Sequence, residues 1–298
     1  TSVTELNTKK EPSAITDEEK EQATTGYRYD IDGNLLSVSY PKSDWNVTGL
    51  KYEYDQNKWL KTIKVVTADG KEGVLRTYHY DNYGSVDGIT DYRVLSKSGE
   101  LVSDPKSTTC HYTYDVCRRP ASMTYTDDDA PEVIKEAYTY QYDKNSRLVE
   151  ETLQNLYPEK EADRQNEVRY YQYDIRGNLI QTRVEDKLNV ANSYTSTYTY
   201  DVVGNRIKQE QTRSNGTIST DYQYNSLNQL TASNTRTSDG VAKSSKTYTY
   251  DADGNQIKET DSIEKKETQN VYDPAGRLSG CTITKNGVQT VKQTNQYN

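Results

Sequence analysis

Short runs in which aromatic or apolar side chains alternate with polar ones recur along almost the whole chain, and they share one unit, Tyr-x-Tyr-Asp-x-x-Gly-Asn/Arg-Leu. Because side chains point alternately to the two faces of a strand, the spacing Tyr-x-Tyr places both rings on one face. Tyr and Thr also favour the pleated, half-buried surface of a sheet. Each unit therefore predicts a β-strand that ends at its Asp, then a turn, then a second strand that opens at the aliphatic residue.

The second Tyr of the unit recurs from Tyr29 to Tyr297 at a mean spacing near 27 residues. The clearest copies supply the residues that we expect to build the repeat: Tyr27, Tyr29, Asp30 and Gly33; Tyr171, Tyr173, Asp174 and Gly177; Tyr198, Tyr200, Asp201 and Gly204; and Tyr248, Tyr250, Asp251 and Gly254. Another copy keeps Tyr272, Asp273 and Gly276. Weaker copies follow Tyr52, Tyr78, Tyr112, Tyr140 and Tyr222, and in these the Gly position passes to Lys58, Arg118, Ser146 or Asn228.

Two kinds of turn alternate along the chain. In the first, the Asp of the unit can accept hydrogen bonds from backbone amides just downstream, and the Gly can adopt a positive φ. In the second, pairs such as Asn-Gly and Asp-Gly stand between strand-like runs, which is the strongest short signal for a hairpin. These pairs are Asp69-Gly70, Ser98-Gly99, Asn215-Gly216, Asp239-Gly240 and Asn286-Gly287. Each repeat is thus predicted to be a hairpin, and ten repeats give about twenty strands.

The fold class expected from this pattern is all-β: a long antiparallel up-and-down sheet of tandem hairpin repeats, curved or spiralling as a partial shell or crescent. A ladder of tyrosines and aliphatic residues should cross the strands near the first kind of turn, stabilised by cross-strand aromatic pairs. Residues 1–25 are expected to be an acidic leader, either flexible or a short helix that begins at Thr16. Residues 26–298 are the repeats, of which the last is truncated, and we expect the chain to be a piece of a longer protein.

Composition alone would place the chain among disordered acidic proteins. Leu, Ile and Val make up 49 of 298 residues, Phe is absent and the formal net charge is −8, a combination that usually signals disorder. The 28 tyrosines argue otherwise, since a Tyr can bury a large ring while its hydroxyl stays hydrogen-bonded or hydrated. The acidic charge argues against nucleic acid as a partner, and no apolar run is long enough to insert into a membrane.

Candidate catalytic and metal-binding residues are few. His79 and His111 lie in predicted strands, and neither has the convergent partners that a catalytic base or zinc site needs. Cys110 and His111 should point to opposite faces of their strand, so they cannot easily chelate a metal together. Cys110, Cys117 and Cys281 are too few for a disulfide framework. We expect free thiols, although a bridge between Cys110 and Cys117 stays open.

Acidic segments have simpler interpretations than calcium binding. The segments 30–34 and 251–255 resemble calcium loops, but their Gly stands at the fourth rather than the sixth place, which favours turn capping. Asp127-Asp128-Asp129 is expected to be a solvated acidic loop. Neither a nucleophile elbow nor a phosphate-binding loop is present. The sequence therefore predicts that the chain is not an enzyme and holds no cofactor or metal.

The repeating unit resembles the YD repeat of the Rhs and wall-associated protein family, which also occurs in teneurins and insecticidal toxin complexes. The resemblance covers residues 27–298, and its recurrence makes it specific. It implies repeats that wind into a spiralling β-shell, which in bacterial members often encloses a C-terminal toxin. It also implies a secreted or cell-surface location and repeats that are not themselves catalytic.

Two hypotheses for function follow. In the first, the chain is a structural YD/Rhs-repeat segment of a β-shell or extended surface scaffold in a bacterial toxin-delivery protein, and its partners are the rest of its own longer chain and a C-terminal toxin cargo. In the second, it is an adhesin-like module that binds glycans or surface proteins through exposed rows of tyrosine. Tyrosine rings that face inward and stack on one another would favour the first hypothesis, and a continuous exposed row would favour the second.

Overall fold

The computed structural model describes residues 2–6, 24–41, 45–157, 160 and 163–296. Within them lie 22 β-strands, all members of one sheet, and a short 3₁₀ helix, η3 (Val190–Asn192). The chain divides into two compact units, formed by Thr1–Tyr140 with Leu153–Arg164 and by Gln141–Thr152 with Gln165–Asn298. The division passes through β10 (Ala130–Tyr142) and β11 (Leu148–Asn155).

In the first unit each strand pairs antiparallel with the next along the chain. Its strands before β10 are β1 (Ser2–Leu6), β2 (Thr24–Tyr29), β3 (Leu35–Ser39), β4 (Val47–Tyr54), β5 (Leu60–Thr67), β6 (Glu72–Tyr80), β7 (Val86–Tyr92), β8 (Ser107–Tyr114) and β9 (Pro120–Asp127).

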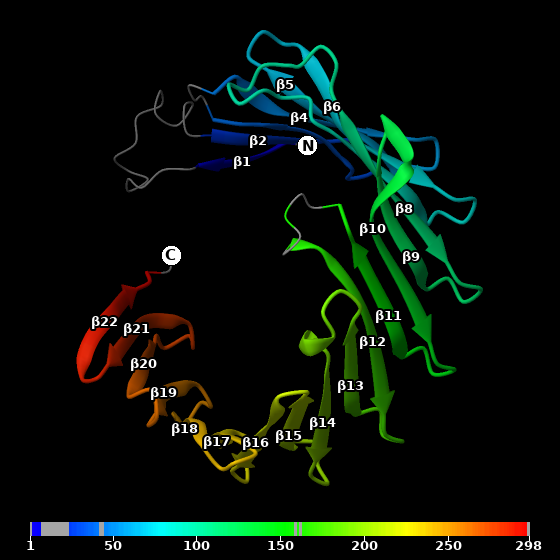
Figure 1. Cartoon of the computed structure of the whole chain (residues 1–298). Coiled ribbons are helices and arrows are strands. Elements are labelled where there is room, and N and C mark those ends of the chain that lie inside the picture. Colours follow the sequence, from blue (N-terminus) through cyan, green and yellow to red (C-terminus); the bar gives the residue numbers. More distant parts are fainter. Residues whose placement is uncertain (1, 7–23, 42–44, 158–159, 161–162, 297–298) are drawn as a thin grey trace. The chain divides into compact units, whose positions relative to one another are not determined.

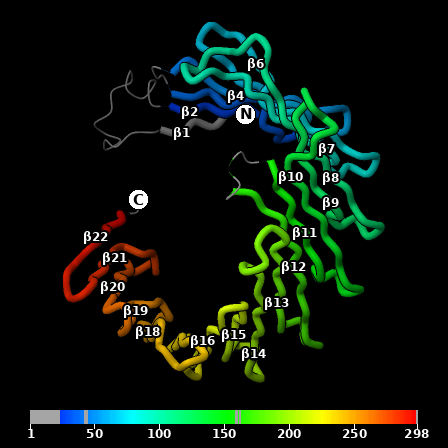
Figure 2. The backbone as a smooth tube through the Cα atoms, viewed as in Figure 1, coloured from blue at the N-terminus to red at the C-terminus, as the bar shows by residue number. Residues whose placement is uncertain are grey.

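The second unit continues the same up-and-down order, as Figures 1 and 2 show for the run from β12 to β22. Its strands are β12 (Gln165–Tyr173), β13 (Leu179–Asp186), β14 (Tyr194–Tyr200), β15 (Arg206–Arg213), β16 (Gly216–Tyr224), β17 (Leu230–Thr237), β18 (Ala242–Tyr250), β19 (Gln256–Asp261), β20 (Lys266–Tyr272), β21 (Leu278–Lys285) and β22 (Val288–Thr294).

The hairpins that carry the Tyr-x-Tyr-Asp unit share one irregularity of register. In β2–β3, Arg28 lies opposite Ser37 but Tyr29 lies opposite Leu35. The second strand of the hairpin, which we call the return strand, therefore holds one extra residue at this point. The same shift occurs beside Tyr54, Tyr80, Tyr114, Tyr173, Tyr200, Tyr224, Tyr250 and Tyr272. A β-bulge of this kind follows from a turn whose last residue is left-handed, and it increases local twist.

The segment between β7 and β8 packs over one face of the first unit, which the sequence did not reveal. Val47, Val65 and Val94 form a buried cluster, and Leu101 packs against it. Val94 and Leu101 belong to the segment between β7 and β8, where a bridge pairs Leu95 with Leu101. The glycine at position 73 lies directly beneath this segment, since a Cβ there would stand 2.5 Å from Leu101 Cδ2 and 2.9 Å from Val94 Cγ2. The extra residues between β7 and β8 thus supply a small core to an otherwise single-layered sheet.

The prediction of an all-β chain of antiparallel up-and-down hairpins is confirmed, with 22 strands among the described residues against about twenty expected. The glycines of the second kind of turn, including Gly70, Gly240 and Gly287, all have positive φ. In the expected leader, Ser2–Leu6 forms β1 and pairs with β2. The helix start at Thr16 and the truncated repeat at Tyr297 lie outside the described residues, and the curvature of the sheet stays a prediction.

Candidate functional site

In eight repeats the second Tyr joins its own repeat to the one before. Its hydroxyl donates a hydrogen bond to the backbone carbonyl of the residue that opens the preceding return strand. Eight such bonds, of 2.6–3.1 Å, run from Tyr54 to Leu35, Tyr80 to Leu60, Tyr114 to Val86, Tyr173 to Leu148, Tyr200 to Leu179, Tyr224 to Arg206, Tyr250 to Leu230 and Tyr272 to Gln256. We call this bond the tyrosine clasp. The rings are half-buried, so these tyrosines serve cohesion between repeats.

The Asp of the unit organises the turn that follows. In the first repeat, Asp30 Oδ1 accepts hydrogen bonds from the amides of Asp32 and Asn34, at 2.9 and 2.8 Å, and Oδ2 accepts one from Asn34 Nδ2 at 2.8 Å. Asp174, Asp201 and Asp251 repeat this arrangement with Asn178, Asn205 and Asn255. The turn-capping interpretation of these segments is thereby confirmed. The described residues hold no cluster of three or more His, Cys, Asp or Glu that could bind a metal ion.

The residue three places after the Asp is left-handed in every described repeat. Glycine fills it at Gly33, Gly84, Gly177, Gly204, Gly254 and Gly276, with φ from 73° to 95°. Lys58, Arg118, Ser146 and Asn228 fill it elsewhere, with φ from 59° to 66°, as the sequence predicted. One correction applies: the copy after Tyr78 keeps its glycine, at Gly84.

Arginine completes the turn in three repeats and also covers tyrosine rings. Arg147 donates from Nε to Asp143 Oδ2 at 2.7 Å and from Nη1 to the Asp174 carbonyl at 3.1 Å, and its guanidinium lies 4.8 Å from the centre of the Tyr173 ring. Further guanidinium groups lie over Tyr114, Tyr170, Tyr194, Tyr198 and Tyr222. Cation–π contacts therefore take a place that the sequence assigned to aromatic pairs, although Trp59 and Tyr80 do form a ring pair, with centroids 5.2 Å apart.

Two adjoining repeats depart from this plan, and a hollow lies between their turns. Four places after Asp55 stands Trp59, and four places after Asp81 stands Ser85, where other repeats have Asn, Gln or Arg. The Trp59 indole lies against the left-handed Gly84, since a Cβ on that glycine would stand 2.6 Å from Trp59 Cζ2. The hollow has a volume of about 670 Å³ and is lined by Asp55, Asn57, Trp59, Lys61, Tyr78, His79, Tyr80, Asp81, Asn82 and Asp87.

Several polar groups that line this hollow lack partners. Asp55 Oδ1 accepts from the amides of Asn57 and Trp59, at 2.8 and 2.9 Å, but Asp55 Oδ2 has no hydrogen bond within the described part of the chain. The side chains of Lys61, His79 and Asp87 likewise make no hydrogen bond or ion pair to any other described residue. The hollow thus combines an aromatic pair with acidic, basic and imidazole groups that no other described side chain engages, so they are available to a ligand.

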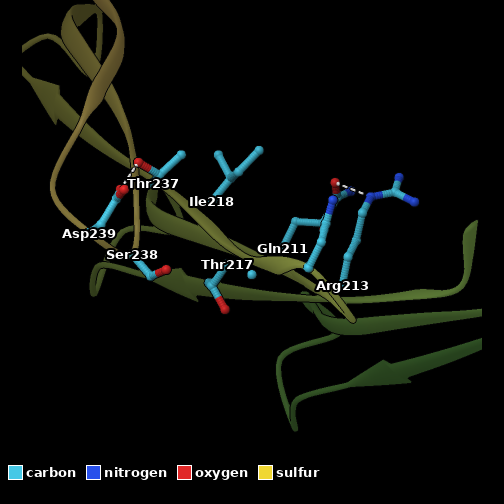
Figure 3. Close-up of a pocket in the computed structure, with 9 residues that line it drawn as sticks. Gln211, Arg213, Thr217, Ile218, Thr237, Ser238 and Asp239 are labelled. Atoms are coloured by element: carbon cyan, nitrogen blue, oxygen red, sulfur yellow. Dashed lines mark hydrogen bonds between the residues drawn. The ribbon is translucent and has the colours of Figure 1, made fainter. Parts of the chain in front are cut away.

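A second hollow, of about 280 Å³, lies at the opposite kind of turn in β15–β17 (Figure 3). Five of its seven polar side chains already have partners in the chain. Arg213 Nε donates to Gln211 Oε1 at 3.3 Å, its Nη1 donates to the Asn192 carbonyl at 2.7 Å, and Thr237 donates to Asp239. This hollow therefore offers a ligand little unsatisfied hydrogen-bonding capacity.

The predicted repeat residues are thus brought together as structural contacts. The first tyrosines of the units make side-chain bonds of their own: Tyr171 donates to Glu151 Oε2 at 3.0 Å, and the Tyr248 hydroxyl lies 3.1 Å from Ser233 Oγ. Sequence reasoning missed the hollow beside Trp59. The available signal was the loss of Asn, Gln or Arg four places after the Asp in two successive copies.

The acidic run before β10 is an exposed turn at Asp128 and Asp129, as expected, whereas Asp127 is half-buried at the end of β9. Asp127 Oδ1 accepts from Thr108 Oγ1 at 2.9 Å and its other oxygen pairs with Lys135, while Asp128 Oδ1 accepts from Thr109 Oγ1 at 2.9 Å. These carboxylates fasten the end of β9 to β8. Cys110, Cys117 and Cys281 are free thiols, so the bridge left open between the first two is absent here.

The electrostatics of the repeats follow from these bonds. Hydrogen bonds from the Asn side chain four places on lower the pKa of Asp30, Asp174 and Asp251 below the usual value. Burial raises the pKa of the clasp tyrosines Tyr54, Tyr80, Tyr114, Tyr173, Tyr200, Tyr224 and Tyr250. At neutral pH these shifts favour the ionised aspartates that accept the turn hydrogen bonds and the neutral tyrosine hydroxyls that donate the clasp bonds.

Comparison with solved structures agrees with this geometry. The chain superposes on the crystal structure of TcdB2-TccC3-Cdc42 with a TM-score of 0.55 and 16% identity, covering 88% of this chain and 13% of that one. The chain shares its fold with part of that structure. A Photorhabdus luminescens Tc holotoxin pore carrying a TccC3 mutation gives a TM-score of 0.38 at 18% identity, over 98% of this chain and 16% of that one. Neither a family model nor a curated protein matches the sequence, and no described helix is long and apolar enough to span a membrane.

Proposed function

We propose that the chain is a structural YD/Rhs-repeat segment that builds part of a β-shell or extended scaffold in a secreted or surface-exposed toxin-delivery protein. The tyrosine clasp is the observation that carries the proposal. The tyrosines that define the repeat donate their hydroxyls to neighbouring backbone in eight repeats. Because these hydroxyls bond to the backbone of the preceding repeat, the tyrosines serve to extend the sheet from one repeat to the next.

The shared fold supports the toxin-related part of the proposal. The structure with which the chain shares its fold contains TccC3, and TccC3 is also a component of the Photorhabdus luminescens Tc holotoxin. The chain spans only 13% of the first neighbour, so the proposed partners are the rest of a longer chain and a toxin cargo held by it. The second hypothesis, an adhesin-like module that binds glycans along rows of tyrosine, has less support because the clasp rings are half-buried and their hydroxyls are bonded.

Electron cryomicroscopy of the longest natural protein that contains this sequence tests the proposal. We expect the sheet from β2 to β22 to lie in a wall, with density for another part of the protein on its enclosed side. A sheet that stands free of any enclosure, with both faces in solvent, would refute the shell and leave the adhesin hypothesis in its place.

A further inference from the structure

The repeats contain a recurring slot for a cation beside the turn carboxylate. In its fullest form, the Arg147 guanidinium is held by Asp143 Oδ2, by the carbonyl of Asp174 in the next turn, and by the Tyr173 ring. Arg119 and Arg277 pair with Asp115 and Asp273 in the same way. The slot therefore selects a planar cation that can pair with a carboxylate and stack on a tyrosine.

Other repeats use a different group to donate to Oδ2 of the turn carboxylate. In four of them an Asn side chain four places on donates, as Asn178 does to Asp174. In the repeat of Asp81, the left-handed residue of the following turn supplies a cation instead. Arg118 reaches back to Asp81 Oδ2 at 2.5 Å and covers both Tyr114 and Tyr83. Lys58 also reaches back to the preceding turn, where it pairs with the exposed Asp32 and not with the turn carboxylate Asp30. The donor to the turn carboxylate thus comes from the residue four places on or, at Asp81, from the following turn.

At Asp55 neither position supplies a side-chain donor. The position four places on is Trp59, and the left-handed residue of the following turn is Gly84, which has no side chain. Asp55 Oδ2 accordingly has no partner within the described residues, while Trp59 and Tyr80 present an aromatic pair beside it. Asp87 adds a second carboxylate without an ion pair, and Asn57 and Asn82 add amides to the lining.

We propose that this hollow binds the guanidinium of an arginine in a partner polypeptide, which completes the slot in trans. Asp55 pairs with the guanidinium, the Trp59 indole provides a stacking surface, and Asp87 adds negative charge. Lys61, at the same hollow, suits the carbonyl groups of the peptide that carries the arginine. This inference does not depend on the shell proposal, since a free-standing scaffold could carry the same site.

Fluorescence anisotropy of a labelled, neutral Gly/Ser-rich peptide with one arginine tests the site in the intact chain. We expect saturable binding that weakens at least tenfold when citrulline, a neutral analogue of similar shape, replaces the arginine. Asp55→Asn should weaken binding to a similar extent without loss of fold, because Asn225 occupies the same position in another repeat and accepts the same two amide bonds. Asp253→Asn removes the same charge from an exposed turn elsewhere and should leave binding unchanged.

Trp59→Arg provides an independent test. It recreates the pairing of Asp143 with Arg147, so we expect the hollow to be filled from within, peptide binding to be lost and thermal stability to be retained. The proposal is overturned if Asp55→Asn or Trp59→Arg binds the arginine peptide as the unchanged chain does, or if citrulline binds equally well. Saturable binding of a neutral oligosaccharide in place of the peptide would also overturn it and would assign the hollow to a glycan.

Discussion

Replacing Gly84 by Ala tests whether Trp59 fixes one repeat against the next. Gly84 has φ +83°, and an added Cβ would lie 2.6 Å from Trp59 Cζ2 and 3.0 Å from Cη2. Gly33 provides a matched control in the same unit, since its φ is +87° and nothing lies within 4 Å of an added Cβ. A left-handed Ala costs about 1–2 kcal/mol at either site, and forced overpacking adds about 1–3 kcal/mol at Gly84 alone.

Urea unfolding followed by tryptophan fluorescence measures this difference, because both tryptophans, Trp45 and Trp59, lie in the first unit. We expect Gly84→Ala to lower the free energy of unfolding by about 1–3 kcal/mol more than Gly33→Ala does. In a Trp59→Asn background, which restores the residue of other repeats, that excess should vanish. Equal losses for the two Ala variants in the unchanged background would refute the role assigned to Trp59.

Three further predictions concern the cover, the turns and the clasp. Gly73→Ala, whose Cβ would meet Leu101 and Val94, should destabilise the first unit by about 1–3 kcal/mol. An unchanged melting temperature would show that the segment between β7 and β8 does not cover the sheet. Folding lowers the pKa of Asp30, Asp174 and Asp251. Their contribution to the stability of the fold is therefore present above the unfolded pKa near 4 and is lost as pH falls below it. Thermal melts followed by circular dichroism that stay constant from pH 6 to pH 2 would contradict this. Folding raises the pKa of clasp tyrosines such as Tyr200 and Tyr250, and that of Tyr171 to about 12. Their stabilisation is therefore complete below the unfolded pKa near 10 and is lost as pH rises through the folded values. Tyrosine ionisation, read by ultraviolet absorbance, should therefore accompany alkaline unfolding; ionisation near pH 10 in a chain that stays folded would be inconsistent with the clasp.

The turns could be predicted from sequence because their chemistry is local. Asp30 and Gly33 act within five residues of chain, so the residue types and their spacing determine both the hydrogen bonds and the positive φ. Even the unusual left-handed Lys58 and Arg118 follow from alignment of the repeats.

The clasp and the hollow depend on contacts between repeats, and residue order along one repeat does not specify them. The carbonyl that Tyr200 reaches belongs to Leu179, 21 residues earlier, and carbonyls carry no sequence signature. The same applies to Asp128, which bonds to Thr109 across a strand pair, and to Leu101, which folds over the sheet from a long connection. Register, bulges and cover segments decide such contacts, so they emerge only from the folded chain.

Replacing clasp tyrosines by Phe tests the central claim most directly. Combining Tyr173→Phe, Tyr200→Phe, Tyr224→Phe and Tyr250→Phe keeps the rings and removes four hydroxyl-to-carbonyl bonds of 2.8–3.0 Å in the second unit. At about 1 kcal/mol for each bond, we expect a loss of about 4 kcal/mol. Tyr83→Phe, at a ring that is 82% exposed, should have no effect. A quadruple variant as stable as the unchanged chain would contradict the claim that these tyrosines hold the repeats together.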